Sequence, residues 1–158
     1  MLTKKILVKY EKIRSIFFWF MLKATGVKIE SKVYLSSGVK IYNRDKLKIG
    51  NNVFINDYFW CNAKGGVNIG NDVLIGPNVT IHSSNHNYAN SGKPFRLQGH
   101  TDKQVNIGCN VWLCASVVIS PGVSICDNVV VAAGSVVTKN ITKSGVYGGV
   151  PAKFIKNI

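Results

Sequence analysis

The sequence predicts an all-β chain folded as a parallel β-helix of hexapeptide repeats, and three observations carry this prediction. An aliphatic residue recurs at every sixth position of residues 107–139, namely Ile107, Leu113, Ile119, Ile125, Val131 and Val137. The same register continues upstream through Ile69, Ile75 and Ile81. Turn-forming residues separate the aliphatic positions, as in the runs IGNN, IGND, IGPN and ISPG. Because this period fits neither a helix nor an alternating strand, it indicates short strands stacked in a solenoid.

A β-sandwich of short strands is the alternative interpretation of the same residues. A sandwich gives no reason for a fixed period, whereas each unit of a solenoid stacks on an equivalent neighbour. The repeat therefore favours the β-helix.

Residues 1–28 are expected to form a short amphipathic helix. Ile6, Tyr10, Ile13, Phe17 and Phe20 recur at helical spacing, and Lys5, Lys9 and Lys12 lie on another face. The apolar run 16–22 is too short to span a membrane, which takes about twenty residues. Two roles stay open and are compatible. The helix either caps the first coil or lies on a membrane surface, with Phe18, Trp19 and Phe20 in the headgroup region.

Residues 29–142 are predicted to form about five coils, which start at Ile29, Ile49, Ile69, Ile107 and Ile125. The first two coils are each two residues longer than eighteen, and an insertion at 87–106 interrupts the third. Cys61 falls in an inward-facing position of the second coil. Because the flat faces of such a narrow prism stay exposed, we expect the chain to form oligomers.

Charge is concentrated at the two ends of the chain, whose formal net charge is +13. The segment 1–28 carries seven Lys or Arg and one Glu, and residues 143–158 form an extended basic tail. Such surfaces attract nucleotides, nucleic acids or anionic lipids. No nucleic-acid-binding module accompanies the charge, so no nucleic-acid partner is expected.

The four cysteines and the N-terminal residues indicate the cellular compartment of the protein. The cysteines show neither a CxxC pair nor a zinc-site spacing, so they are expected to be packing residues in a reducing compartment, without a metal. No small-residue cleavage site follows a clean apolar stretch near the N-terminus. We therefore expect a cytoplasmic protein, with residues 1–22 as a candidate peripheral contact with the membrane.

The insertion is where chemistry is expected. It follows the polar run IHSSNH, and all three histidines, His82, His86 and His100, lie in or beside it. Long insertions in compact domains are usually functional, and histidine transfers protons near neutral pH. One of the three histidines is therefore predicted to be catalytic.

Four motifs carry a resemblance to a known family: IGPNVTIHSSNH (75–86), IGCNVWLCASVVISPGVSI (107–125), VVVAAGSVVTK (129–139) and GGVPAKFIK (148–156). This part of the chain is similar to the hexapeptide-repeat acetyltransferases with a left-handed β-helix. The nearer branch contains maltose, galactoside and nodulation-factor O-acetyltransferases and relatives from capsule or O-antigen gene clusters. The left hand is implied by the resemblance alone, since crossovers are generally right-handed.

The resemblance implies an acetyl-CoA-dependent transferase in which His86 acts as general base. A hydroxyl of the acceptor would attack the thioester directly, without a covalent acyl-enzyme and without a metal. Asn85, His82 and Arg96 are the candidate acceptor-binding residues. Asp57 and Asp102 are candidates, by charge only, for the group that orients the imidazole of His86.

The same resemblance implies a donor groove between two prisms of a homotrimer. The donor-binding residues that it implies are Trp112, Ala115, Ala133, Thr138, Lys139 and Lys156. For Ala115 and Ala133, a purely structural need for small residues explains the sequence nearly as well.

The predicted function is O-acetylation of a sugar or glycan intermediate. Residues 1–28 do not match the N-terminal region of the maltose or galactoside enzymes, and Tyr58, Phe59 and Trp60 are bulky where a small sugar would be recognised. These departures favour a larger, lipid-linked glycan acceptor. The alternatives are N-acetylation of an amino-sugar nucleotide, acetylation of an antibiotic, a zinc carbonic anhydrase on the same prism, and a non-enzymatic scaffold.

Overall fold

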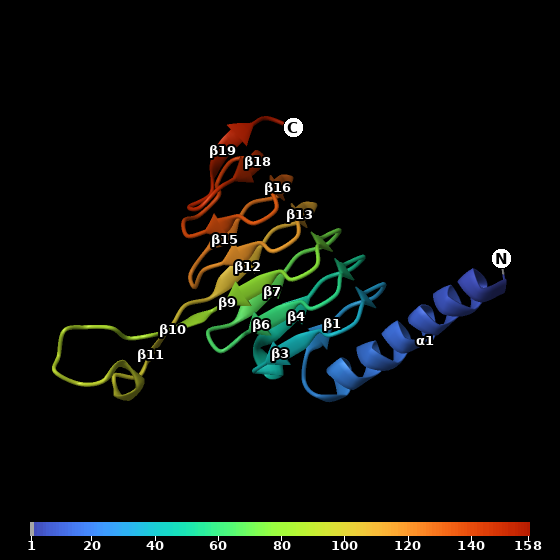
Figure 1. Cartoon of the computed structure of the whole chain (residues 1–158), viewed down its shortest axis with the longest axis horizontal. Coiled ribbons are helices and arrows are strands. Elements are labelled where there is room, and N and C mark those ends of the chain that lie inside the picture. Colours follow the sequence, from blue (N-terminus) through green and yellow to red (C-terminus); the bar gives the residue numbers. More distant parts are fainter. Residues whose placement is uncertain (1) are drawn as a thin grey trace.

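The computed structural model describes the backbone of residues 2–158, and their side chains except those of residues 2–8 and 11. A helix lies at one end of a stack of short strands, and a long loop projects from the side of the stack (Figure 1). The strands form three parallel sheets, which are the three faces of a triangular prism. The predicted parallel β-helix is therefore confirmed.

Each face is a ladder of strands from successive coils. Face A contains β1 (Lys28–Ile29), β4 (Leu47–Ile49), β7 (Val67–Ile69), β12 (Val105–Ile107) and β15 (Ser124–Ile125). Face B contains β2 (Tyr34–Leu35), β5 (Phe54–Ile55), β8 (Leu74–Ile75), β13 (Val111–Leu113), β16 (Val129–Val131) and β18 (Gly145–Gly148). Face C contains β3 (Lys40–Tyr42), β6 (Trp60–Asn62), β9 (Thr80–His82), β14 (Val118–Ile119) and β17 (Val136–Val137).

The five predicted coils are present, and part of a sixth follows them. A bridge from Ile125 to Ile141 continues face A, and β18 continues face B beside β16. The chain then turns back as β19 (Lys153–Lys156), which pairs with β18 in the antiparallel sense. The C-terminal end of the prism is thus closed by a hairpin.

Columns of aliphatic side chains fill the prism. The face A column aligns Ile29, Ile49, Ile69, Ile107 and Ile125, each at most 7% exposed. Cys61 stands in the face C column between Ile41 and Ile81, and its burial raises the pKa of the thiol to about 12. All four cysteines are free. Each buried aliphatic side chain contributes roughly 1.5–3 kcal/mol relative to an exposed one.

Left-handed backbone angles make the corners. At the corner from face A to face B, Lys32, Asn52, Asp72, Asn110 and Asn128 all have φ between 53° and 58°. Asn and Asp accept this conformation at low cost, which explains their recurrence in the repeat. The predicted turn chemistry is therefore present at the corner of each coil.

Irregularity is confined to the corner from face C to face A, here called the C–A corner. Ile41 and Ile49 are eight positions apart rather than six, and the 3-10 helix η1 (Arg44–Lys46) occupies the extra length. Cys61 and Ile69 repeat this spacing in the second coil, and the long insertion separates Ile81 from Ile107 in the third. One edge of the prism thus carries every departure from the period.

The helix α1 (Leu2–Ala24) covers the first coil. Leu22 is fully buried against the prism, and the buried Ser15 Oγ accepts a hydrogen bond from the Leu35 amide at 2.9 Å. Lys5 and Ile6, which belong to the predicted helical pattern, have side chains outside the described set. Among the residues described, no helix has the length and apolarity needed to cross a membrane.

Candidate functional site

The candidate site is a two-stranded ribbon that leaves the prism at the C–A corner of the third coil. Its strands are β10 (Ser84–His86) and β11 (His100–Asp102), which pair antiparallel with His86 opposite His100. Between them the chain forms the projecting loop seen in Figure 1, which includes the 3-10 helix η2 (Phe95–Leu97). The sequence predicted an insertion but not this pairing.

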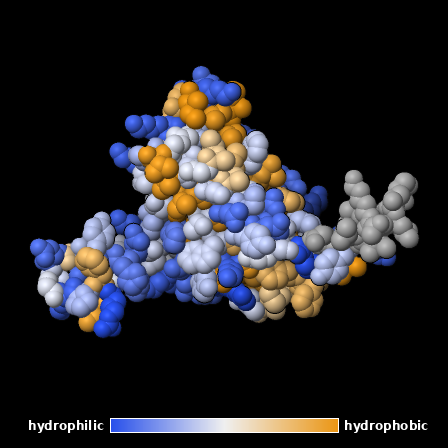
Figure 2. Space-filling view, viewed as in Figure 1, coloured by the Kyte–Doolittle hydropathy of each residue, from blue (hydrophilic) through white to orange (hydrophobic). Residues whose placement is uncertain are grey.

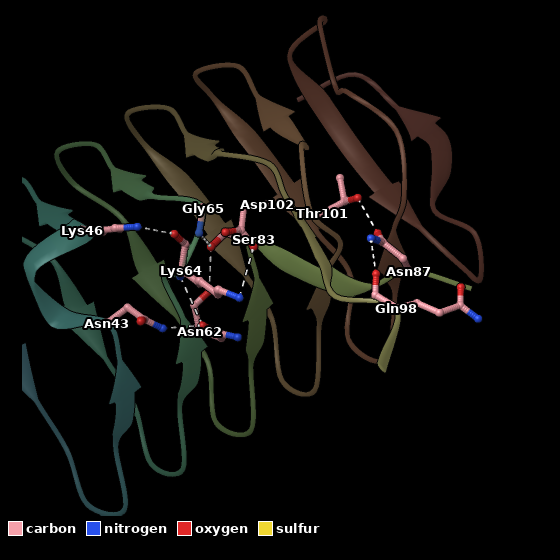
Figure 3. Close-up of polar contacts among 10 residues, drawn as sticks. All are labelled: Asn43, Lys46, Asn62, Lys64, Gly65, Ser83, Asn87, Gln98, Thr101 and Asp102. Carbon is pink, nitrogen blue, oxygen red and sulfur yellow. Dashed lines mark hydrogen bonds and ion pairs between the residues drawn. The ribbon is translucent and has the colours of Figure 1, made fainter. Parts of the chain in front are cut away.

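The base of the ribbon is locked to the coil beneath it. Ser83 is fully buried, and its hydroxyl donates to the Asn62 carbonyl at 2.8 Å and accepts from the Gly65 amide at 2.9 Å. The Lys103 amide donates to the Ser83 carbonyl at 2.8 Å. A Cβ at Gly65 would overlap the Ser83 carbonyl oxygen and lie 2.7 Å from the Lys103 nitrogen. This close backbone approach fixes where the ribbon begins (Figure 3).

Internal hydrogen bonds hold the loop beyond the ribbon. The Asn87 side chain donates to the Gln98 carbonyl at 3.0 Å and accepts from the Thr101 hydroxyl at 2.6 Å. The Gln98 side chain donates to the carbonyls of Ala89 and Lys93. Figure 3 shows Asn87, Gln98 and Thr101 converging at the tip of the ribbon. The strand that carries His86 is therefore supported from both ends.

His86 is exposed at the mouth of a small pocket. Its ring centroid lies 4.2 Å from that of His100. The pocket has a volume of about 290 Å³ and is lined by Asn85, His86, Asn87, Tyr88, Thr101, Lys103, Ser120 and Pro121. A larger hollow of about 650 Å³ lies within the loop and holds no histidine. We regard the smaller pocket as the site, because only it contains a group that can move a proton near neutral pH.

His82 is separate from this pair. It lies on β9, and its ring packs against Trp60 with a centroid distance of 4.8 Å. Partial burial lowers the pKa of His82. Burial thus favours the neutral form of this ring.

The two candidate orienting aspartates are both engaged elsewhere. Asp57 accepts hydrogen bonds from the Ser36 hydroxyl and the Ser37 amide, and these bonds lower the pKa of its carboxyl. Asp102 is opposite Ser84 on the ribbon and lies 3.9 Å from the Lys64 ammonium. Within one chain, the partner placed against His86 is instead His100.

The predicted donor-binding residues fall on two different edges of the prism. Ala115 and Ala133 stack at the corner from face B to face C, here called the B–C corner, where the Gly134 amide donates to the Ala115 carbonyl. Trp112 is 49% exposed on face B. Thr138 and Lys139 lie on the C–A corner, one coil beyond the pocket residues Ser120 and Pro121.

Neither of the remaining two predicted residues lines the pocket. Arg96 is exposed in η2 on the projecting loop. Lys156 is exposed on β19, opposite Val146. One chain thus places Asn85 and His86 in the pocket lining, stacks Ala133 on Ala115 at the B–C corner, and leaves the other predicted residues outside the pocket.

Several pocket residues were missed by sequence reasoning. Tyr88, Thr101 and Lys103 line the pocket and lie outside every motif, whereas Ser120 and Pro121 belong to the ISPG turn of the 107–125 motif but were not predicted to be site residues. His100 was noticed as one of three histidines, but its place beside His86 depends on the ribbon register. A search for two alternating polar segments flanking the insertion would have suggested the hairpin. Among the described residues, no group of three His, Cys, Asp or Glu side chains is placed to hold a metal ion.

The chain is also similar to known proteins. Residues 104–139 match the family described as bacterial transferase hexapeptide (six repeats). The galactoside O-acetyltransferase of Escherichia coli (strain K12) is 38% identical over 82% of this chain and 60% of its own length. The chain therefore spans about 60% of that relative.

Two solved structures share the fold. A galactoside acetyltransferase in complex with coenzyme A superposes with a TM-score of 0.80 and 34% identity, over 87% of this chain and 68% of that one. A maltose O-acetyltransferase from Clostridium difficile 630 gives a TM-score of 0.70 and 32% identity, over 84% and 70% of the two chains.

Proposed function

We propose a function from one established premise: the chain belongs to the hexapeptide-repeat acetyltransferase family. On this premise we infer that it transfers an acetyl group from acetyl-CoA to a hydroxyl of a sugar or glycan. The proposal is supported by relatives named as galactoside and maltose O-acetyltransferases, one of them in complex with coenzyme A.

The observation that carries the proposal is the placement of His86. An imidazole stands exposed beside a pocket, on a ribbon locked at its base, where an acceptor hydroxyl can approach from solvent. A hydroxyl is a poor nucleophile near pH 7, so a base within hydrogen-bond reach is the first chemical requirement. Among the residues lining the pocket, His86 best meets it.

The proposed step is a direct transfer. An imidazole nitrogen of His86 takes the proton from the acceptor hydroxyl while the hydroxyl oxygen bonds to the thioester carbonyl carbon. The carbon–sulfur bond breaks, and the imidazolium of His86 returns the proton to the departing sulfur. Atoms and charge balance without a covalent acyl-enzyme. The small volume of the pocket suits a single sugar hydroxyl with its neighbouring atoms.

Donor binding is proposed to need two subunits of a homotrimer. One prism presents Trp112, Ala115 and Ala133 on face B and the B–C corner, whereas His86 stands at the C–A corner. Two edges of one prism cannot line one groove, but an edge from each of two neighbouring prisms can. The small alanines would let an extended pantetheine chain approach the backbone, and Lys139 and Lys156 would face its phosphates.

The test is acceptor-dependent release of free coenzyme A from acetyl-CoA, over a panel of sugars, nucleotide sugars and lipid-linked glycans. His86→Ala should lower kcat by about 10²–10⁴-fold while coenzyme A binding persists. His100→Ala is the matched control, because it removes the adjacent ring and leaves His86 in place.

The two variants separate the possible roles. Retained turnover in His86→Ala together with loss in His100→Ala would move the base to His100. Failure of the wild-type protein to bind coenzyme A would overturn the enzymatic proposal and favour a scaffold.

A further inference from the structure

The outer side of α1, from Tyr10 to Phe20, is an exposed apolar stripe among the side chains that the structure describes. Side chains that face the prism recur as Ser15, Phe18, Trp19 and Leu22, all buried or half-buried. On the opposite side, Tyr10, Ile13, Ile16, Phe17 and Phe20 are each 51–69% exposed. A helix that only capped the first coil would need polar residues there. The second apolar side therefore calls for a partner of its own.

The position of the helix restricts what that partner is. α1 lies across the first-coil end of the stack, and its N-terminal half extends beyond the prism (Figure 1). Apolar surface is visible at this lower end of the molecule in Figure 2. Because the stripe faces away from the end of the prism, a broad, flat partner can contact it without meeting the prism.

Basic residues lie on the stripe, at Lys9, and along one flank of it, at Lys12 and Lys23. Lys9, Lys12 and Lys23 are exposed, and Lys12 and Lys23 are eleven residues, or three helical turns, apart and so share one flank. The sequence of α1 contains six Lys or Arg and one acid, Glu11. An apolar strip flanked by lysines complements a bilayer with anionic headgroups, where the rings enter the acyl boundary and the ammonium groups stay at the phosphates.

We propose that the outer side of α1 docks the protein on the surface of an anionic phospholipid bilayer. The inference is independent of the acetyl-transfer chemistry, since it uses none of the ribbon or corner residues. In a homotrimer with parallel prisms, three such helices would lie at the same end and bind one membrane together, which raises the apparent affinity. Glycan intermediates linked to lipid would then be within reach of the site.

The test is co-sedimentation of the full-length protein with vesicles. Wild type should bind vesicles of equal parts phosphatidylcholine and phosphatidylglycerol, and should bind pure phosphatidylcholine at least about tenfold more weakly. Phe17→Ser/Phe20→Ser should reduce binding to the anionic vesicles by about tenfold or more. Phe95→Ser/Leu97→Ser is the matched control, because these side chains are similarly exposed, on the projecting loop.

A second pair of variants separates position from net charge. Lys9→Gln/Lys12→Gln/Lys23→Gln should weaken binding, whereas Lys40→Gln/Lys48→Gln/Lys93→Gln, with the same net charge, should bind like wild type. Thermal unfolding of all variants should stay close to wild type, because the changed side chains lie outside the core.

Three results would overturn the proposal. The first is failure of the wild-type protein to bind anionic vesicles, and the second is equal loss of binding in the test and control variants. The third is a smaller assembly for Phe17→Ser/Phe20→Ser in analytical ultracentrifugation without vesicles, which would assign the stripe to a second copy of the chain.

Discussion

Asp57 illustrates how single polar residues are used in this fold. Its carboxylate accepts from the Ser36 hydroxyl and, at 2.8 Å, from the Ser37 amide, both one coil earlier at the same corner. These bonds stabilise the ionised form and hold the pKa of Asp57 below its ordinary value of 3.8. A residue that by charge was a candidate partner for the imidazole of His86 is instead a link between coils.

Asp57→Asn is expected to lower the free energy of unfolding at neutral pH by about 1 kcal/mol, because a charge-assisted bond becomes a neutral one in a screened position. A depressed carboxyl pKa contributes stability above pH 3.8, and this is lost as the pH falls through the folded-state pKa. Urea unfolding near pH 7 and near pH 3 should therefore show the difference shrinking in acid. The exposed Asp45→Asn serves as control, and an Asp57→Asn effect that did not change with pH would contradict the assignment.

At the scale of the element, the backbone angles and close contacts at the corners limit which residues can stand there. Gly38 and Gly134 occupy the same position of the B–C corner in the first and fifth coils, with φ of 68° and 69°. A Cβ at Gly38 would lie 2.5 Å from the Tyr58 ring, whereas a Cβ at Gly134 would meet nothing within 4 Å. Replacing either glycine by alanine therefore carries the same cost of a left-handed backbone, but only the replacement of Gly38 adds a steric clash.

Gly134→Ala is expected to destabilise the fold by about 1–2 kcal/mol, which is the cost of a left-handed alanine. Gly38→Ala should cost about 1 kcal/mol more, because the Tyr58 ring has to move. Thermal and urea unfolding of the two variants measure the difference. Adding Tyr58→Ala should remove the excess for Gly38→Ala, and equal costs for the two glycines would argue against the clash.

The ribbon depends on a glycine of a different kind. Gly65 is needed for space, since its added Cβ would overlap backbone atoms of Ser83 and Lys103 that cannot rotate away. Gly65→Ala should therefore displace the base of the ribbon and lower kcat by about tenfold or more, as small misplacements of catalytic groups do. Turnover and coenzyme A binding measured on the folded variant are the readouts. Unchanged kcat would show that the ribbon base does not position His86.

At the scale of the whole molecule, the proposed function requires a site shared between subunits. His86 and the alanine corner lie on different edges of one prism, so each site would take His86 from one subunit and Ala133 from its neighbour. A site shared between subunits predicts that two inactive variants can complement each other, which a site within one subunit does not predict.

His86→Ala and Ala133→Trp are each expected to be inactive, the second because the indole fills the donor groove. When the two variants are co-expressed, random mixing in trimers should leave about a quarter of the sites with both native residues, and activity should return to that extent. Acetyl transfer by the co-purified mixture is the measurement. Continued inactivity of a mixture shown to contain both chains would place the whole site within one subunit.

The coils could be predicted from the sequence because each repeat contains its own inward-facing residue and its own corner residue. An inward aliphatic such as Ile107 and a corner residue such as Asn110 lie within a few positions of each other, so periodicity reveals both. Even Cys61 could be assigned inward from register alone. The three histidines could be picked out because they lie in or beside the insertion, whereas the choice of His86 among them rested on the family resemblance.

Other features depend on contacts that have no fixed spacing in the chain. His100 faces His86 because β10 and β11 pair across fourteen residues, and Ser120 reaches the pocket because the next coil passes above it. Asp102 bonds to Lys64 of an earlier coil, although sequence offered it as a partner for His86. Such neighbours follow from the length of the insertion and from how coils stack.

The sequence alone was enough to predict that this chain is a β-helix, where its five full coils start, and which residues fill them, whereas the partial sixth coil appeared only in the structure. Each of these is a local property, repeated every six residues, and it needs no knowledge of distant contacts. Only the tertiary structure decided which polar residues share an edge of the prism, that the ribbon sets His100 beside His86, and that α1 turns an apolar stripe away from the core. These features depend on how separate elements pack. The insertion and the helix lie outside the six-residue repeat, so the repeat does not fix their neighbours.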